Sequence, residues 1–256
     1  MAPAVSRLSY TPVKGLALIH PDELYVDVHG VDDNRRFYLI REDGRRYEIT
    51  KDGRTALVVP AYDAETEMLS LRFPDGTAVE GPVQLDGRVV TDFYSRPVSG
   101  RVVQGAFAEG LSRFVGKPLR IVKADRPAGG VDRANGPVSL ISEASLSELA
   151  RQAGVDEVDG RRFRMLITVS GCRPHEEDEW IGREVRIGSL VIRVLEQVAR
   201  CAATTFNPLS GERDLDTLRI IRSYRGARDG KNLDFGIYGE VVQPGRVAVG
   251  DAVEPQ

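Results

Sequence analysis

The chain has 256 residues, of which 41% are hydrophobic and 29% are charged, and its formal net charge is −3 at pH 7. This composition excludes an intrinsically disordered chain and is typical of a soluble globular protein with one large domain or two small ones. Because the chain has no overall basic charge, nucleic acids and anionic membranes are disfavoured as partners.

Short runs of β-type composition follow one another along most of the chain, separated by glycine, proline and aspartate. Clear turn signals are Asp43-Gly44, Asp52-Gly53 and Asp86-Gly87. Strands spaced about ten residues apart are typical of a barrel or a sandwich, so the predicted fold class is mainly β. The predicted strands span residues 5–10, 24–28, 36–41, 56–62, 69–73, 101–103, 119–122, 163–169, 184–187, 190–195, 235–242 and 247–249.

Helical periodicity appears in three segments, at residues 106–115, 142–153 and 214–225. Ser142 can cap the second helix and Gly154 can end it. The third segment has an aspartate at its start and a glycine directly after it, so its two ends are marked in the same way.

The stretch from Lys123 to Pro137 reads KADRPAGGVDRANGP. It is polar and rich in glycine and proline, and we expect no regular structure within it. Such stretches commonly separate domains, so we predict a domain boundary here.

The cellular compartment is indicated by what the sequence lacks. The two cysteines are too few for a disulfide framework, which fits a reducing compartment. The opening residues lack the basic head and apolar run of a signal peptide. The longest apolar runs are far shorter than the roughly 20 residues of a membrane-spanning helix. We therefore expect a cytoplasmic protein without a membrane partner.

Several common functional motifs are missing. The sequence has no phosphate-binding loop, no dinucleotide fingerprint and no helical zinc-protease motif. The three histidines, His20, His29 and His175, are scattered, and each is better interpreted as exposed or hydrogen-bonded than as a metal ligand. Cysteine spacing typical of iron–sulfur clusters is also absent.

The most informative segment runs from residue 198 to residue 214 and reads VARCAATTFNPLSGERD. Taken alone, Cys201 is more often a small buried apolar residue than a ligand. The adjacent Arg200 shifts that balance, because a nearby guanidinium favours the thiolate, which is the form that binds metals or acts as a nucleophile.

This segment resembles the signature of the MOSC domain family, named after the C-terminal domain of molybdenum cofactor sulfurases. The family pattern is an Arg-Cys pair, a Thr-Thr pair, a Pro-x-x-Gly turn and a leucine-rich helix. The chain has these parts in the same order, as Arg200-Cys201, Thr204-Thr205, residues 208–211 and residues 215–224.

The first half resembles the N-terminal β-barrel that accompanies one branch of this family. Residues 10–15 (YTPVKG) and 30–37 (GVDDNRRF) are similar to two of its motifs. The resemblance therefore covers nearly the whole chain. It implies β-barrel domains with a few flanking helices, over residues 1–122 and 123–256. The functional type that it resembles is the mitochondrial amidoxime reducing component with its bacterial relatives.

The resemblance also implies roles for five residues. Cys201 is the catalytic cysteine that ligates the metal of a molybdenum–pterin cofactor (molybdopterin), and a soft thiolate suits that metal. Lys14, Arg35 and Arg164 hold the phosphate and the pterin, for which arginine forks are well shaped. Arg200 is a further cofactor contact. Without the resemblance, Lys14 and Arg35 are also compatible with surface charges, and Arg164 with a salt bridge at a strand edge.

The chain departs from the family pattern at three places. Met165-Leu166 replaces Pro-Asn, Gly15 replaces a serine, and Asn34 replaces an aspartate. The first two changes remove polar groups near the implied pocket but leave the metal ligand intact.

The implied reaction is reductive removal of oxygen from a small-molecule N-hydroxylated substrate. The metal and pterin carry this chemistry, while the protein supplies the thiolate and the pocket. Electrons then come from a separate electron-transfer protein with a flavin or an iron–sulfur cluster. Two alternatives remain open: a carrier that binds the cofactor or sulfur without turnover, and a non-catalytic remnant that kept only the fold.

Overall fold

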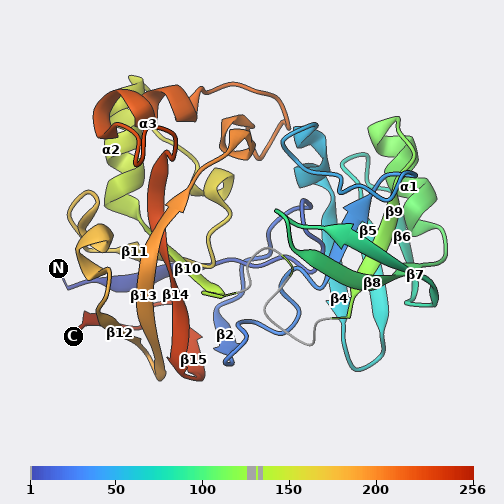
Figure 1. Ribbon diagram of the computed structural model, residues 1–256, viewed down its shortest axis with the longest axis horizontal. Coiled ribbons are helices and arrows are strands. Elements are labelled where there is room, and N and C mark those ends of the chain that lie inside the picture. Colours follow the sequence, from blue (N-terminus) through green and yellow to red (C-terminus); the bar gives the residue numbers. More distant parts are fainter. Residues whose placement is uncertain (1, 126–130, 132–134) are drawn as a thin grey trace.

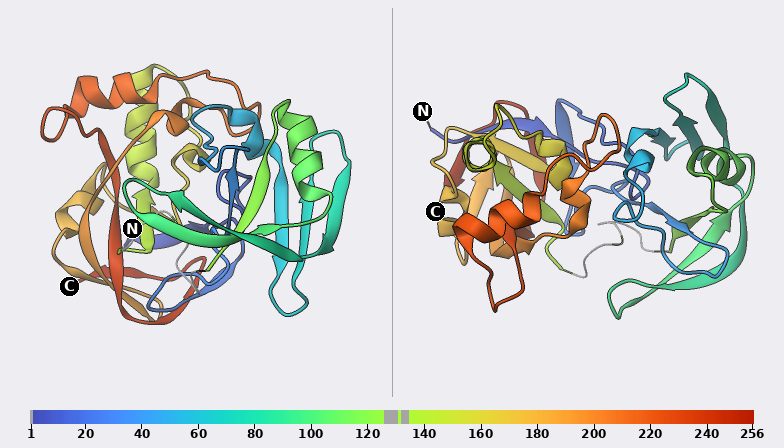
Figure 2. Two further views of the ribbon diagram at one scale, coloured as in Figure 1. Left: turned by 45° about the vertical axis from the view of Figure 1, so that its right-hand side comes forward. Right: turned by 90° about the horizontal axis from the view of Figure 1, so that it is seen from above.

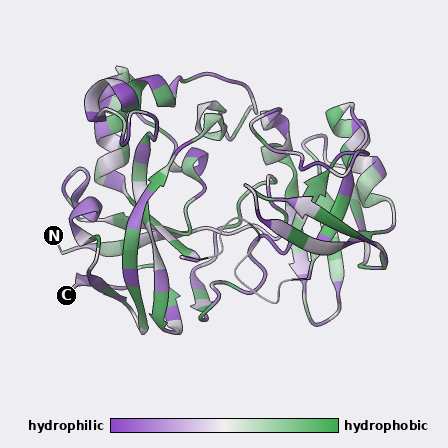
Figure 3. Cartoon of the chain, viewed as in Figure 1, coloured by the Kyte–Doolittle hydropathy of each residue, from purple (hydrophilic) through white to green (hydrophobic). Residues whose placement is uncertain are grey.

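The computed structural model describes residues 2–125, 131 and 135–256 of the chain. Within this part, sixteen strands and three α-helices form two β-rich bodies that lie side by side (Figure 1). This arrangement confirms the mainly β fold with a few flanking helices. Hydrophobic residues concentrate along the strands of both bodies, whereas the outer loops are more polar (Figure 3).

The C-terminal body is built around a seven-stranded sheet with the order β1-β11-β10-β14-β13-β12-β16. Its β10 and β11 pair in parallel, and its other neighbours pair antiparallel. A separate two-stranded ribbon joins β15 to β2. The bounds are β1 Ala4–Leu8, β2 Glu23–Val26, β10 Val138–Ser142, β11 Ile167–Ser170, β12 Glu184–Ile187, β13 Leu190–Ala199, β14 Asp234–Gln243, β15 Gly245–Ala248 and β16 Val253–Pro255.

The N-terminal body contains two antiparallel sheets, β3-β9-β8-β7 and β4-β5-β6, with helix α1 (Phe107–Val115) beside them (Figure 2). A 3-10 helix, η1 (Gly53–Leu57), precedes β4. The bounds of the strands are β3 Phe37–Ile40, β4 Val59–Asp63, β5 Met68–Arg72, β6 Ala78–Pro82, β7 Leu85–Asp92, β8 Pro97–Val103 and β9 Arg120–Ala124.

The two bodies are not consecutive segments of the chain. Strand β1 pairs with β11 and β2 pairs with β15, so the first strands belong to the C-terminal body. The boundary expected between residues 122 and 123 falls inside β9. In the expected linker, Lys123 and Ala124 belong to β9, and residues 126–130 and 132–134 lie outside the described residues.

Each body has its own apolar core. In the C-terminal body, Trp180 is 2% exposed and packs with buried strand residues such as Ile167 and Ile192. In the N-terminal body, Phe37, Leu71 and other strand residues pack against α1 through its buried Leu111. Because each core is separate, the space between the bodies can form a site without disturbing either core.

The three predicted helices are confirmed. Helix α2 spans Glu143–Ala153, and the Ser142 hydroxyl accepts a hydrogen bond from the Ser145 N–H at 3.1 Å, as the sequence signal predicts. Gly154 ends the helix in the left-handed region with a φ of 69°. Helix α3 (Thr217–Arg225) is capped by an aspartate side chain and followed by a glycine. None of the helices in the described part of the chain is long and apolar enough to span a membrane.

The strand predictions contain errors. Strands β6, β7, β10 and β16 are missing from the prediction. The turn expected at Asp86-Gly87 is wrong, because both residues lie within β7, where the pairing with β8 shifts between Asp86 and Arg88. A glycine inside a strand often marks such an irregularity, and its turn-like character misled the assignment.

Candidate functional site

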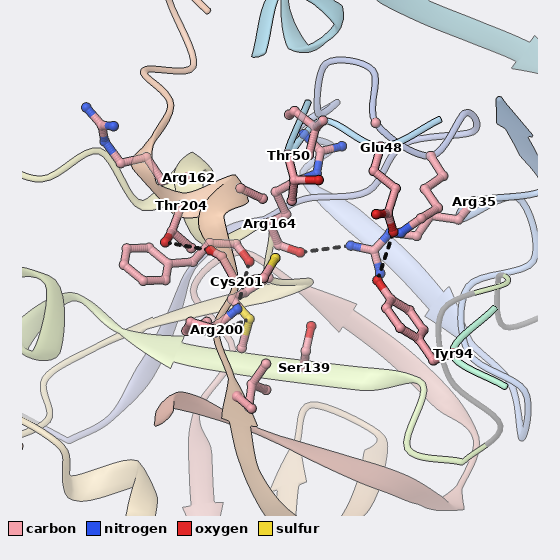
Figure 4. A pocket seen from close by; sticks show the side chains of 18 of the residues that line it. Arg35, Glu48, Thr50, Tyr94, Ser139, Arg162, Arg164, Arg200, Cys201 and Thr204 are labelled. Atoms are coloured by element: carbon pink, nitrogen blue, oxygen red, sulfur yellow. Dashed lines mark hydrogen bonds between the residues drawn. The ribbon is translucent and has the colours of Figure 1, made fainter. Parts of the chain in front are cut away.

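A cavity of about 400 Å³ lies between the two bodies. Its lining includes all five residues singled out in the sequence, namely Lys14, Arg35, Arg164, Arg200 and Cys201. Figure 4 shows Arg35 on one side of this space, with Arg164, Arg200 and Cys201 facing it from the other. The fold therefore brings together residues that are far apart in sequence and come from both halves of the chain.

Cys201 follows β13 and occupies the position directly before a 3-10 helix, η4 (Ala202–Thr205). Its side chain is exposed, and its sulfur faces the cavity (Figure 4). The backbone is held in place, because the Thr204 hydroxyl donates to the Cys201 carbonyl at 3.1 Å and also pairs with the Thr217 hydroxyl at 2.6 Å. The thiol is thus accessible on a well-anchored segment.

Arg200 uses its guanidinium to hold the segments around Cys201 together. Its Nε donates to the Phe235 carbonyl at 2.7 Å, and its Nη1 donates to the Phe163 carbonyl at 3.1 Å. Its Nη2 lies 2.9 Å from the Met165 sulfur, and the guanidinium also covers the Phe163 ring at 5.1 Å. These contacts link the end of β13 to β14 and to the segment before β11.

Arg35 and Arg164 form a reciprocal link between the two bodies. Arg35 Nη2 donates to the Arg164 carbonyl at 3.0 Å, and Arg164 Nη2 donates to the Leu16 carbonyl at 2.6 Å. Both arginines have left-handed backbones, with φ of 56° and 55°. Non-glycine residues adopt this conformation at a cost of roughly 1 kcal/mol or more, and such residues often cluster at functional sites.

A second contact joins the loop after Cys201 to the N-terminal body. A Cβ atom added at Gly53 would lie 2.4 Å from the Gly211 carbonyl oxygen, so no larger residue fits there without movement. Close by, Arg213 Nη2 donates to the Thr50 carbonyl at 3.3 Å. Because Thr50 lines the cavity, this contact fixes part of its wall.

The charges around the cavity are mostly positive. Besides the four predicted cations, Arg162 also contributes to the lining, although its guanidinium points away from Cys201 (Figure 4) and binds Asp214 at 2.7 Å. Glu48 is the one carboxylate among the lining residues of this cavity as described. It pairs with Arg46 at 3.0 Å and accepts a hydrogen bond from the Tyr94 hydroxyl at 3.3 Å. Such a lining favours an anionic ligand.

The sequence analysis missed several polar lining residues, among them Glu48, Tyr94 and Ser139. Tyr94 lies in the turn between β7 and β8, where its φ of 56° is unusual for a bulky residue. None of the three belongs to a recognisable motif, and only the folding of distant segments brings them to the cavity. No signal in the sequence marks them.

The departures from the family pattern have different structural consequences. Met165 lines the cavity and is 4% exposed, whereas Leu166 packs into the C-terminal core. Gly15 lines the cavity with a φ of 91°, and open space surrounds the position of its missing side chain. Asn34 accepts a hydrogen bond from the Thr11 N–H at 3.3 Å, a structural role that an aspartate oxygen could also fill.

The chain belongs to the MOSC domain family. The family model described as MOSC domain matches residues 124–254, and the one described as MOSC N-terminal beta barrel domain matches residues 2–118. Together they confirm the family resemblance of both halves.

Similar proteins include the mitochondrial amidoxime-reducing component 1 of Xenopus laevis, which is 28% identical over 97% of this chain and 81% of its own length. The mitochondrial amidoxime reducing component 2 of Bos taurus is 35% identical over 46% of this chain and 36% of its own length. The molybdenum cofactor sulfurase of Caenorhabditis briggsae is 36% identical over 40% of this chain and 14% of its own length. Among solved structures, the YUAD protein from Bacillus subtilis matches 100% of this chain and 96% of its own chain with a TM-score of 0.46 and 14% identity.

Proposed function

We propose that this chain binds a molybdenum–pterin cofactor in the cavity and removes oxygen reductively from small N-hydroxylated substrates. The observation that carries the proposal is the convergence of Cys201 with Lys14, Arg35 and Arg164 on one cavity between the bodies. The similarity to amidoxime-reducing components, which in one case extends over 97% of the chain, supports the same function.

The donor set fits a metal that brings most of its own ligands. Among the described residues, no group of three or more histidines, cysteines or acidic residues could hold a metal ion. Cys201 is thus a single soft ligand, which suits a metal already bound by the two sulfurs of a pterin dithiolene. The surrounding cations suit the phosphate of such a cofactor.

In this proposal each residue has a distinct task. Cys201 supplies the thiolate, and Lys14, Arg35 and Arg164 bind the phosphate and pterin. Arg200 contributes to the cofactor site and holds the Cys201 segment through its contacts with Phe235 and Phe163. When bound, the cofactor supplies two-electron oxygen-atom transfer chemistry.

The reducing electrons come from a separate protein carrying a flavin or an iron–sulfur cluster. The sequence has neither a flavin fingerprint nor the cysteine spacing of a cluster, so this chain has no such relay of its own. An artificial reductant can therefore replace the partner in an assay.

The proposal is tested with protein produced in a host that makes the cofactor. With dithionite as reductant, we expect conversion of amidoximes or hydroxylamines to amidines or amines across a panel of polar and apolar compounds. Cys201→Ala at matched protein concentration should lose this activity. Full molybdenum loading without Cys201-dependent reduction of any compound would overturn the proposal that the chain is a reductase.

A carrier of the cofactor or of sulfur is the second candidate. The exposed Cys201 thiol and the similarity to a molybdenum cofactor sulfurase favour it. A carrier would release its cofactor to an apo-molybdoenzyme and activate it, in a Cys201-dependent manner and without any reductase activity. Tight retention of the cofactor in that assay would argue against it.

A further inference from the structure

Ser139 lies on the central part of the C-terminal sheet, in β10 between β11 and β14. It lines the cavity, and its side chain points toward the space in front of Cys201 (Figure 4). The position is rigid, because β10 forms backbone pairs on both sides, including Ser139 with Tyr238 of β14.

The Ser139 hydroxyl is oriented by a backbone group. Its oxygen accepts a hydrogen bond from the Leu166 N–H at 3.1 Å. A hydroxyl has one proton to donate and two lone pairs with which to accept. Since Leu166 occupies only one lone pair, the hydroxyl keeps its proton available for donation to a ligand in the cavity that Ser139 lines.

The surroundings make this donor distinctive. The nearby lining residues Met165, Val198 and Ala199 are apolar. The Thr204 hydroxyl also lines the cavity, but it is engaged with Cys201 and Thr217. Tyr47, Thr50 and Tyr94 also carry hydroxyls among the lining residues, and that of Tyr94 donates to Glu48 at 3.3 Å. The lysine and arginine donors at the site are charged and suited to phosphate. Ser139 is therefore a neutral donor beside the apolar Met165-Leu166 segment.

We propose that Ser139 is a specificity-determining residue that donates a hydrogen bond to the oxygen of the substrate's N–OH group. The inference rests on the proposed function, because it assumes that this oxygen is bound close to Cys201. A ligand without the oxygen leaves the hydroxyl unpaired, so the residue distinguishes the N-hydroxylated substrate from its deoxygenated product. Discrimination of this kind also favours product release.

The inference is tested by equilibrium binding rather than by turnover. The oxidised, molybdenum-loaded full chain is titrated with benzamidoxime and with benzamidine, without reductant. For Ser139→Ala, we expect the dissociation constant of benzamidoxime to rise about 5- to 10-fold, as loss of one hydrogen bond implies. The constant for benzamidine, which lacks the oxygen, should change less than about 2-fold by the same reasoning.

Matched variants separate contact from folding. Ser139→Thr keeps the hydroxyl and should restore most of the benzamidoxime affinity, and Ser189→Ala makes the same chemical change at an exposed position outside the cavity. If Ser139→Ala does not fold, Ser139→Val removes the hydroxyl with a side chain favoured in strands. Molybdenum content and melting temperature are measured for every variant.

Three outcomes would overturn the inference: equal weakening of both ligands, no weakening of benzamidoxime, or no binding of benzamidoxime to the wild type. Failure of the proposed function looks different. In that case the wild type reduces no compound when dithionite is added, while the Ser139-dependent difference between the two dissociation constants persists.

Discussion

Cys172 and Cys201 both follow a strand of the seven-stranded sheet, β11 in one case and β13 in the other, yet their surroundings are opposite. Cys172 is partly buried against the C-terminal core and lies near Glu176 and Glu177. Burial, together with these two carboxylates, raises the pKa of the Cys172 thiol to about 12. Cys201 is exposed at a cavity whose charged lining residues are mainly cations.

The comparison shows that two thiols that each follow a strand can have opposite surroundings, and the exposed one is the proposed metal ligand. A metal ligand must be a thiolate, and burial among carboxylates opposes ionisation. At neutral pH, Cys172 therefore stays a protonated, apolar packing residue. The protein offers one candidate thiolate, and the charges around it are of the sign that attracts an anionic cofactor.

Metal content gives the most direct test of the contrast between Cys201 and Cys172. After expression in a host that makes the cofactor, we expect near one molybdenum per chain in the wild type, as a single-thiolate site implies. Cys201→Ser should lose most of it, because a neutral hydroxyl is a poor replacement for a thiolate. Cys172→Ser should retain it, and elemental analysis of the purified proteins measures all three.

The matched Cys172 variant makes the result interpretable. If both serine variants lose molybdenum equally, the loss reflects general damage to the fold rather than a missing ligand. Equal molybdenum in the wild type and Cys201→Ser would remove Cys201 as the ligand.

Local signals in the sequence predicted the parts of the fold that depend on local interactions. The three helices carry apolar periodicity and end signals such as Ser142 and Gly154, and these act through neighbouring residues. Strands such as β7 were missed because strand pairing depends on distant partners. In addition, Asp86-Gly87 has the sequence of a turn, although it lies within β7 where the pairing is irregular. The placement of β1 beside β11 is likewise a long-range property.

The candidate site likewise combines residues that sequence motifs identify with residues that only the folded structure reveals. Family motifs identified residues such as Lys14 and Cys201, and the structure places them at one cavity. Three-dimensional packing was needed to find that Arg200 holds backbone carbonyls and that Arg35 contacts the Arg164 carbonyl. Ser139 carries no sequence signal, because its orientation depends on Leu166, which directly precedes the neighbouring strand β11.

The cations around Cys201 provide the second test. We expect Lys14→Ala and Arg35→Ala each to lower molybdenum occupancy several-fold, because each removes a positive charge from the proposed phosphate-binding site. Arg35→Ala should also reduce the free energy of unfolding by about 1 kcal/mol, through loss of its hydrogen bond to the Arg164 carbonyl. Metal analysis and denaturant unfolding measure the two effects separately.

A distant arginine serves as the control for this test. Arg45 has an exposed side chain, pairs with Asp43 at 2.7 Å and does not line the cavity. Arg45→Ala should leave both molybdenum occupancy and stability nearly unchanged. Full molybdenum occupancy in both Lys14→Ala and Arg35→Ala would show that the N-terminal body does not help to bind the phosphate of the cofactor.

The smallest expected effect concerns the pH dependence of stability, and it depends on Cys172. A cysteine in the unfolded chain ionises with a pKa of about 8.5, whereas the Cys172 thiol in the folded protein has a pKa raised to about 12 by burial and by Glu177 and Glu176. Between these values the unfolded state releases its proton and the folded state does not. Stability should therefore fall as pH rises above roughly 8.5.

The expected fall attributable to Cys172 is about 1 kcal/mol between pH 7.5 and 9.5, after allowance for solvent screening of a partly exposed group. Urea unfolding of metal-free protein at both pH values measures it. Cys172→Ser removes the titrating thiol and should flatten the profile by this amount, because a serine hydroxyl does not ionise in this range. Cys201→Ser is the control, because it makes the same substitution at an exposed position. If Cys172→Ser and the wild type lose stability in parallel, the surroundings of Cys172 do not suppress its ionisation, and the contrast between the two thiols rests on exposure alone.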